Sequence, residues 1–191
     1  MVPVTVRLSL GVEMSRFALL ITCLAITTPA FAKDPFRQDS IVLLQPGSLL
    51  EKRVSVEDLS SYIKRLNEIA TRQAADFTDR VARSGSIVFA VRPDGSRKVW
   101  LDVKPAFSDA DAGSMVAALE AATPCAVRDG TVVAAINVSF WGGKARNMGM
   151  PMPDEWRTAI TGDGVEVTQL VDSIWPQGST PGTSLERARE R

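Results

Sequence analysis

The sequence predicts an α+β domain in which two helices pack on one face of a three-stranded antiparallel sheet. Three observations predict this fold. Apolar residues recur at spacings of three and four over residues 56–83, and they then alternate with other residues over 87–103. A second helical stretch and one more alternating stretch, 131–141, follow. Helix, hairpin, helix and strand in this order build a sheet with its helices on one face.

The first helix is predicted over 56–83 and begins with a capping signal. Ser55 supplies a hydroxyl at the helix start, and Asp58 follows three positions later in a variant of the capping box. No glycine or proline interrupts the stretch before Gly85. One stripe contains the apolar positions Leu59, Tyr62, Ile63, Leu66, Ile69, Ala70, Phe77 and Val81. This stripe is typical of an amphipathic helix whose charged face is solvated.

A β-hairpin is predicted next. Its two alternating stretches are joined by Pro93-Asp94-Gly95-Ser96, which is typical of a turn. The apolar positions that we expect in the core are Ile87, Phe89, Val99 and Leu101. The second stretch is polar at alternate positions, so we expect one face of the sheet to be covered and the other to meet water.

The second helix is predicted between Ser108, which repeats the capping pattern, and Thr123-Pro124, which ends it. After the turn at Asp129-Gly130 comes the strand 131–141. Its alternation assigns two faces: Val132, Ala134, Ile136, Val138 and Phe140 on one, and Val133, Ala135, Asn137, Ser139 and Trp141 on the other. We expect Ile136 and Val138 to join the core.

Residues 1–32 are predicted to be a signal peptide. Arg16 precedes an apolar run over 17–26, and Ala30-Phe31-Ala32 has the small-x-small pattern of a cleavage site. Met14 is a candidate for the true start. We expect export to the periplasm with removal of 1–32. The run is shorter than the roughly 20 residues of a spanning helix, so we expect cleavage rather than a retained anchor, and no transmembrane segment afterwards.

Cys23 offers a lipoprotein interpretation of the same segment. Leu20-Ile21-Thr22-Cys23 loosely resembles a lipobox, but Thr22 is bulkier than the small residue usual at that position. Cleavage after Ala32 is therefore favoured. It leaves Cys125 as the one remaining cysteine, which excludes an internal disulfide and predicts a buried thiol.

The composition argues against several function classes. The chain has no histidine, which removes Ser-His and Cys-His nucleophile pairs and the commonest zinc ligand. Basic and acidic residues number 22 each, with no basic block, so no nucleic-acid partner is expected. We therefore expect a non-enzymatic protein without a cofactor.

Two segments flank the predicted domain, which spans 55–142. Residues 33–54 are expected to form an extended N-terminal segment in which the apolar run 41–44 packs on the domain as a strand or extended segment, followed by a turn at Pro46-Gly47. Residues 143–175 are expected to pack on the domain as a C-terminal extension, in which 165–175 fits either a strand or a helix. Residues 176–191 are expected to be a disordered tail.

Four features of residues 62–142 occur together in a known order. Gly85 opens the first strand, Asp94-Gly95 forms the turn, and Pro124 precedes the final strand after Asp129-Gly130. In this order and spacing the segment resembles the C-terminal domain shared by the TonB and TolA periplasmic proteins. The resemblance implies an α+β fold that binds a periplasmic or outer-membrane protein. The chain lacks their long spacer and, after cleavage, their membrane helix, so we expect the fold without energy transduction.

The resemblance also implies a partner-binding site on the last strand. In the resembled domains this strand lies at a sheet edge and accepts a short segment of the partner as an extra strand. Its counterpart here is 131–141, and the candidate contact residues are Val133, Asn137, Ser139 and Trp141. The alternative is that these side chains cover a sheet face and that 165–175 closes the edge.

Two further features are candidate sites. Trp100 lies on the polar side of its strand and either contacts a partner or is covered by the C-terminal segment. Met148, Met150 and Met152 supply three thioethers, which are soft ligands suited to Cu(I). They suggest the alternative function, a periplasmic small-ligand or copper-handling protein. Because the chain has no histidine, flexible methionines that fill gaps under a loop are the favoured interpretation.

The signal peptide leads to a direct prediction. N-terminal sequencing of the protein recovered from periplasm should begin at Lys33, because Ala30-Phe31-Ala32 provides the cleavage pattern. Recovery solely from the cytosol, or as a full-length membrane species, would contradict export.

Overall fold

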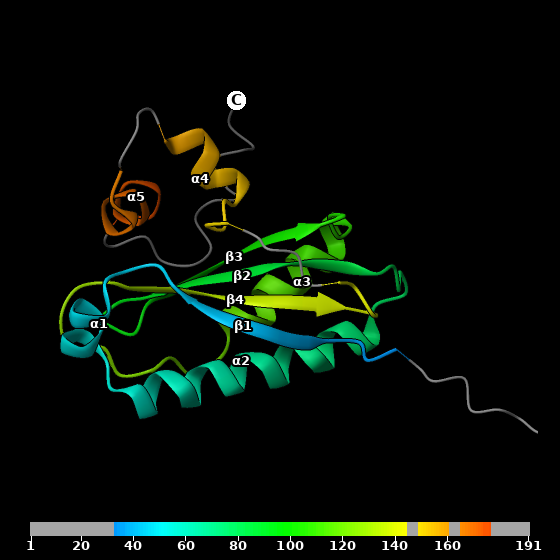
Figure 1. Cartoon of the computed structure of the whole chain (residues 1–191), viewed down its shortest axis with the longest axis horizontal. Coiled ribbons are helices and arrows are strands. Elements are labelled where there is room, and N and C mark those ends of the chain that lie inside the picture. The colour runs from blue at the N-terminus through cyan, green and yellow to red at the C-terminus, as the bar shows by residue number, and fades with distance from the viewer. Residues whose placement is uncertain (1–32, 145–148, 161–164, 177–191) are drawn as a thin grey trace, which may run out of the picture. The chain divides into compact units, whose positions relative to one another are not determined.

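A four-stranded antiparallel sheet forms the centre of the fold in the computed structural model, which describes residues 33–144, 149–160 and 165–176 (Figure 1). The strands lie in the order β1-β4-β2-β3. Their bounds are Arg37–Leu43 (β1), Arg83–Val91 (β2), Arg97–Lys104 (β3) and Val132–Phe140 (β4). The helices are Gly47–Arg53 (α1), Val56–Asp76 (α2), Asp109–Glu120 (α3), Asp154–Ala159 (α4) and Val167–Ile174 (α5). The predicted α+β class is confirmed, with four strands rather than three.

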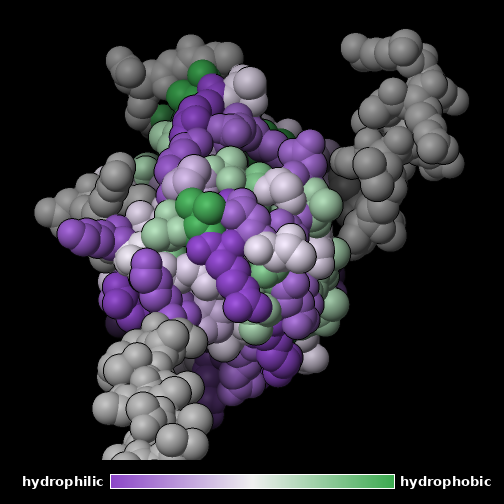
Figure 2. All heavy atoms as spheres, turned by 90° about the vertical axis from the view of Figure 1, so that its right-hand side faces the viewer, coloured by the Kyte–Doolittle hydropathy of each residue, from purple (hydrophilic) through white to green (hydrophobic). Residues whose placement is uncertain are grey.

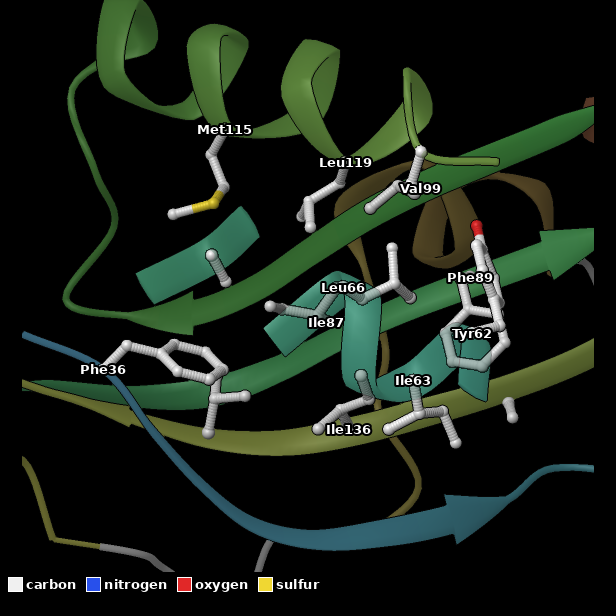
Figure 3. Packing of buried hydrophobic residues seen from close by; sticks show 14 of the residues in the cluster. Phe36, Tyr62, Ile63, Leu66, Ile87, Phe89, Val99, Met115, Leu119 and Ile136 are labelled. Carbon is white, nitrogen blue, oxygen red and sulfur yellow. The ribbon is translucent and has the colours of Figure 1, made fainter. Parts of the chain in front are cut away.

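Helices α2 and α3 pack on one face of the sheet, as predicted, and enclose the larger hydrophobic cluster (Figure 3). Tyr62 and Leu66 of α2 lie over the sheet fully buried. The sheet side of the cluster includes Ile87, Phe89, Val99, Ile136 and Val138, with Leu101 packed against it. The predicted core residues are thus confirmed. Burying one such aliphatic or aromatic side chain is worth about 1.5–3 kcal/mol.

Both predicted helix starts have the expected caps. The Ser55 hydroxyl accepts a hydrogen bond from the Asp58 backbone N–H, and Ser108 does the same for Asp111. The predicted end of the first helix is wrong, because α2 stops at Asp76 instead of residue 83. Phe77 turns to an extended conformation, and its ring packs edge-on against Phe107.

The N-terminal segment is extended only in part. β1 pairs antiparallel with β4, so that Ile41 lies opposite Ile136. The predicted turn at Pro46-Gly47 is instead the start of α1, where the Pro46 carbonyl accepts from the N–H groups of Leu49 and Leu50. β1 is the fourth strand of the sheet: a strand was one of the two forms expected for the apolar run 41–44, but its pairing with β4 was not predicted.

Helices α4 and α5 cover part of the second face of the sheet. Beneath them lies the smaller hydrophobic cluster, which contains Val88, Ala90, Trp100, Val133, Ala135, Trp156, Val167, Leu170, Val171 and Trp175. The predicted packing of 143–175 on the domain is confirmed for the described part of that segment, and the end of the segment forms a helix. Because both faces are covered, every residue of β2 is buried.

Trp141 lies on a different face from the one predicted. It follows β4 with a positive φ of 46°, which breaks the alternation of the strand. Its indole therefore joins the larger cluster beside Phe107. The buried guanidinium of Arg83 lies 5.0 Å from the Phe107 ring centroid and 5.6 Å from that of Trp141, within the range of cation–π attraction.

Two glycines provide a matched test of this packing. A Cβ on Gly85 would lie 2.2 Å from the Asp102 carbonyl oxygen, whereas Gly113 in α3 has no heavy atom within 4 Å of such a Cβ. We expect Gly85→Ala to lower the free energy of unfolding by about 3 kcal/mol through overpacking. Gly113→Ala should raise it by up to about 1 kcal/mol through helix propensity. Urea unfolding measures both, and equal effects would contradict the close approach of β2 and β3.

Candidate functional site

The predicted binding edge is closed. β4, which contains most of the predicted strand 131–141, is hydrogen-bonded to β2 on one side and to β1 on the other. No further strand can be added to a strand with two neighbours. The edge is closed by the N-terminal strand and not by 165–175, most of which is the helix α5. The prediction of an open edge at 131–141 is therefore wrong.

The candidate contact residues on that strand point into the structure. Val133 and Ser139 are buried, as is Trp141. The Asn137 amide lies between two hydroxyls: it accepts from Ser86 Oγ at 2.8 Å and donates to Ser40 Oγ at 3.0 Å. These side chains hold neighbouring strands and helices together and do not form a free contact surface.

Trp100 is likewise covered. Its ring packs edge-on against Trp156 of α4 at 5.6 Å, and its indole N–H donates to the Glu155 carboxylate at 2.8 Å. The interpretation in which the C-terminal segment covers Trp100 is confirmed.

The methionine loop is described only in part. Met148 lies outside the described residues. Met150 is half exposed, while Met152 packs against the smaller cluster and its backbone N–H donates to the Asp102 carboxylate at 2.8 Å. The described part of the loop thus includes a methionine with a packing role.

The sheet has two outer strands, β1 and β3, and the end of α3 contacts the outer side of β3. The Val99 backbone N–H on β3 donates to the Glu120 carboxylate at 3.0 Å. The Arg97 guanidinium donates to the Glu120 carbonyl, and Leu101 packs against the larger cluster. These contacts with the end of α3 cover the start of the β3 edge, at Arg97 and Val99.

The other outer strand, β1, has a free edge. It pairs with β4 on its inner side, and among the described residues no strand pairs with its outer side. Its first half has a register shift between Gln38 and Ser40 and an ion pair between Arg37 and Asp39 at 2.8 Å, both of which discourage strand addition. The remainder, 40–43, has no charged residue.

An apolar groove continues from this edge. Ile41 is 44% exposed and Leu43 is 52% exposed. Their partners Ile136 and Ala134 belong to the larger cluster, so both side chains lie on the α2 face of the sheet. Leu43 also forms part of the wall of an open groove of about 130 Å³ between β1, α1 and α2. The groove is lined by Leu43, Gly47, Leu50, Glu51, Val54, Ser55, Val56 and Leu59.

Polar contacts hold the α1 wall of the groove in place. The Arg53 guanidinium donates to the Thr131 carbonyl at 2.7 Å, and Gln45 Nε2 donates to the same oxygen at 2.9 Å. Gln45 also donates to Thr168 of α5 and accepts from the Val133 backbone N–H. These bonds fix α1 against β4 and α5, so the groove is formed without a ligand.

The opposite end of the sheet has a different surface. Hydrophilic residues predominate there, and hydrophobic ones are scattered among them (Figure 2). Scattered apolar residues are normal on a soluble surface, whereas a contiguous apolar surface suggests a contact site. The groove beside α1 is therefore the stronger candidate.

The groove was missed in the sequence because a turn, and not the helix α1, was expected at Pro46-Gly47. Val56 is 68% exposed although it opens a helix whose other apolar positions were assigned to the core. The apolar run Ile41-Val42-Leu43-Leu44 did predict a strand or extended segment that packs on the domain, but a strand there also presents apolar side chains on both faces, and that consequence was not drawn.

Shifted pKa values do not indicate catalysis at this site. Burial raises the pKa of the Tyr62 hydroxyl, and it raises the pKa of the Cys125 thiol to about 11. Glu155 is partly desolvated, but hydrogen bonds from Lys98 and Trp100 outweigh that effect and lower its pKa. None of these three groups lines the groove.

Comparisons with family models, curated proteins and solved structures found no match. Among the described helices, none combines the length and the apolar character needed to cross a membrane.

Tyr62 provides a test of the buried core groups. Its hydroxyl has no hydrogen-bond partner among the described residues, so Tyr62→Phe should leave the free energy of unfolding at pH 7 unchanged or raise it by about 1 kcal/mol. A loss of stability in this variant would show that the hydroxyl has a stabilising partner.

The same groups predict alkaline sensitivity. Ordinary pKa values are 9.0 for the thiol and 10.0 for the phenol, and both are higher in the folded protein. Above these values the unfolded chain binds fewer protons, so the free energy of unfolding falls as pH rises beyond about 9. In urea unfolding at increasing pH, the decline above pH 10 should be shallower for Tyr62→Phe. Equal declines would contradict the raised pKa of Tyr62.

Proposed function

We propose that this chain is a non-enzymatic protein-interaction module of the periplasm, which binds an extended segment of a periplasmic or outer-membrane protein as an added strand on β1. The observation that carries the proposal is the free, uncharged edge at 40–43, which leads into an apolar groove. Main-chain hydrogen bonds to the edge would hold the segment, and alternate side chains would be selected by the groove.

The exposed edge itself supports this function. Unpaired apolar edges favour aggregation, and natural proteins normally protect them with charges, bulges or covering elements. β1 has such protection at Arg37 and Asp39 but not at 40–43, where Ile41 and Leu43 remain about half exposed. An unprotected edge of this kind is expected where a partner binds.

The proposal keeps the TonB/TolA resemblance for part of the chain. α2, the β2–β3 hairpin, α3 and β4 follow one another in the order expected for that domain. The added β1 takes the place that a partner strand occupies in the resembled domains. We therefore propose the same mode of binding one strand further out.

A pair of lysine substitutions tests the site. Ile41→Lys places a charge on the free edge, and Val81→Lys is the matched control, since Val81 is 47% exposed in the loop before β2. The probe is a displayed library of random short linear peptides, selected on the full chain and then titrated singly. We expect Ile41→Lys to weaken binding by about tenfold or more, because it removes apolar contact and desolvates a charge, and Val81→Lys to leave binding unchanged.

Amide exchange locates the bound peptide. Protection should rise within 40–43 and remain unchanged in α3. Failure to select any peptide, or selected peptides that bind both variants equally, would refute binding at β1.

A further inference from the structure

The groove differs from the neighbouring residues 40–43 of β1 in containing one charge. Five of its lining side chains are apolar, and Glu51 is the single charged residue that lines it. Gly47, Leu50 and Glu51 recur at the helical spacing that places them on one face of α1, and Val54 follows as its C-cap residue. Lys52 and Arg53 fall between these positions and do not line the groove, so the charge that faces a ligand there is negative.

The groove lies where a strand added to β1 would lead. Leu43 belongs both to the last position of β1 and to the groove wall. An added strand presents alternate side chains to the α2 face, beside Ile41 and Leu43, and the next such side chain reaches the groove. Residues two apart in that strand are about 6.6 Å apart, which brings a second side chain to the rim of the groove.

The apolar area favours a short segment over a second copy of the chain. Ile41, Leu43 and Val56 are the large exposed apolar residues at this site, and together they offer on the order of 200 Å². A stable dimer buries about 800 Å² on each partner. A linear segment needs less area because the edge of β1 supplies main-chain hydrogen bonds as well.

Glu51 indicates that the bound segment has a basic residue in addition to its apolar one. Its carboxylate, like that of Glu57, has no ion-pair partner among the described residues, whereas six others pair with Arg or Lys: Asp39, Asp79, Asp102, Asp154, Glu155 and Asp172. A lysine or arginine beside the groove would complement Glu51.

We infer that the groove selects segments in which an apolar residue and a basic residue are two positions apart, with the apolar side chain among Leu50, Val54 and Leu59 and the basic group on Glu51. This inference rests on the proposed strand addition at β1 and names the chemistry of the partner.

The test compares two carboxylates on the full chain. Glu51→Gln removes the groove charge, and Glu57→Gln is the matched control, since Glu57 is exposed on α2 and does not line the groove. The probes are the tightest peptide selected from the random library and the same peptide with its basic residue changed to glutamine. We expect Glu51→Gln to lower the affinity for the basic peptide about two- to fivefold and to leave the affinity for the glutamine peptide unchanged. The difference should shrink at high salt.

Charge reversal sharpens the result. Glu51→Lys should prefer the peptide in which the basic residue is changed to glutamate. The inference would be overturned by peptides that protect 40–43 from exchange but have no basic residue. It would also be overturned by basic peptides whose affinity is unchanged by Glu51→Gln. Both outcomes would leave strand addition at β1 intact. If no peptide binds, the proposed function itself is contradicted. If light scattering instead shows a dimer that Ile41→Lys abolishes, the occupant of the edge is a second copy of the chain and not a peptide.

Discussion

The pairing of β1 with β4 is the constraint on which the rest of the arrangement depends. By occupying the outer side of β4, β1 makes β4 an interior strand beside β2, and both are covered on two faces. β1 itself then becomes the outer strand, with Ile41 and Leu43 partly in solvent. The strand that completes the sheet is therefore also one whose outer side no described strand pairs with.

The same pairing links the two layers of helices. Gln45 follows β1 directly and bonds to Thr131 and Val133 of the β4 region and to Thr168 of α5. Arg53 at the end of α1 bonds to Thr131 from the other direction. A groove wall held by several hydrogen bonds loses little conformational freedom on binding, which lowers the entropic cost of recognition.

The buried cations have structural partners at the two ends of β2. Arg83 lies between Phe107 and Trp141 at its start. Arg92 lies just beyond its end, 3.8 Å from the Trp175 ring centroid and paired with Asp172. These arginines anchor aromatic side chains from remote segments, so their burial is explained by packing.

Local sequence was enough for the elements whose apolar residues repeat with a regular period. The caps at Ser55 and Ser108, the turn at 93–96 and the alternation over 131–140 all predicted what the structure contains. Prediction failed where a distant contact overrides the local pattern. Phe77 leaves the helical stripe to pack on Phe107, and Trp141 leaves the strand alternation through a positive φ.

The sequence by itself determined the α+β class, the two helices, the hairpin, the final strand and the absence of histidine chemistry, because these follow from composition and from periodicities within about 30 residues. The tertiary structure decided which edge is open. The Asn137–Ser40 contact joins residues 97 positions apart, and no local period records such a pairing. The candidate site moved from 131–141 to β1 because an edge is a property of the whole sheet: a strand is open or closed according to its neighbours, whatever its own residues are.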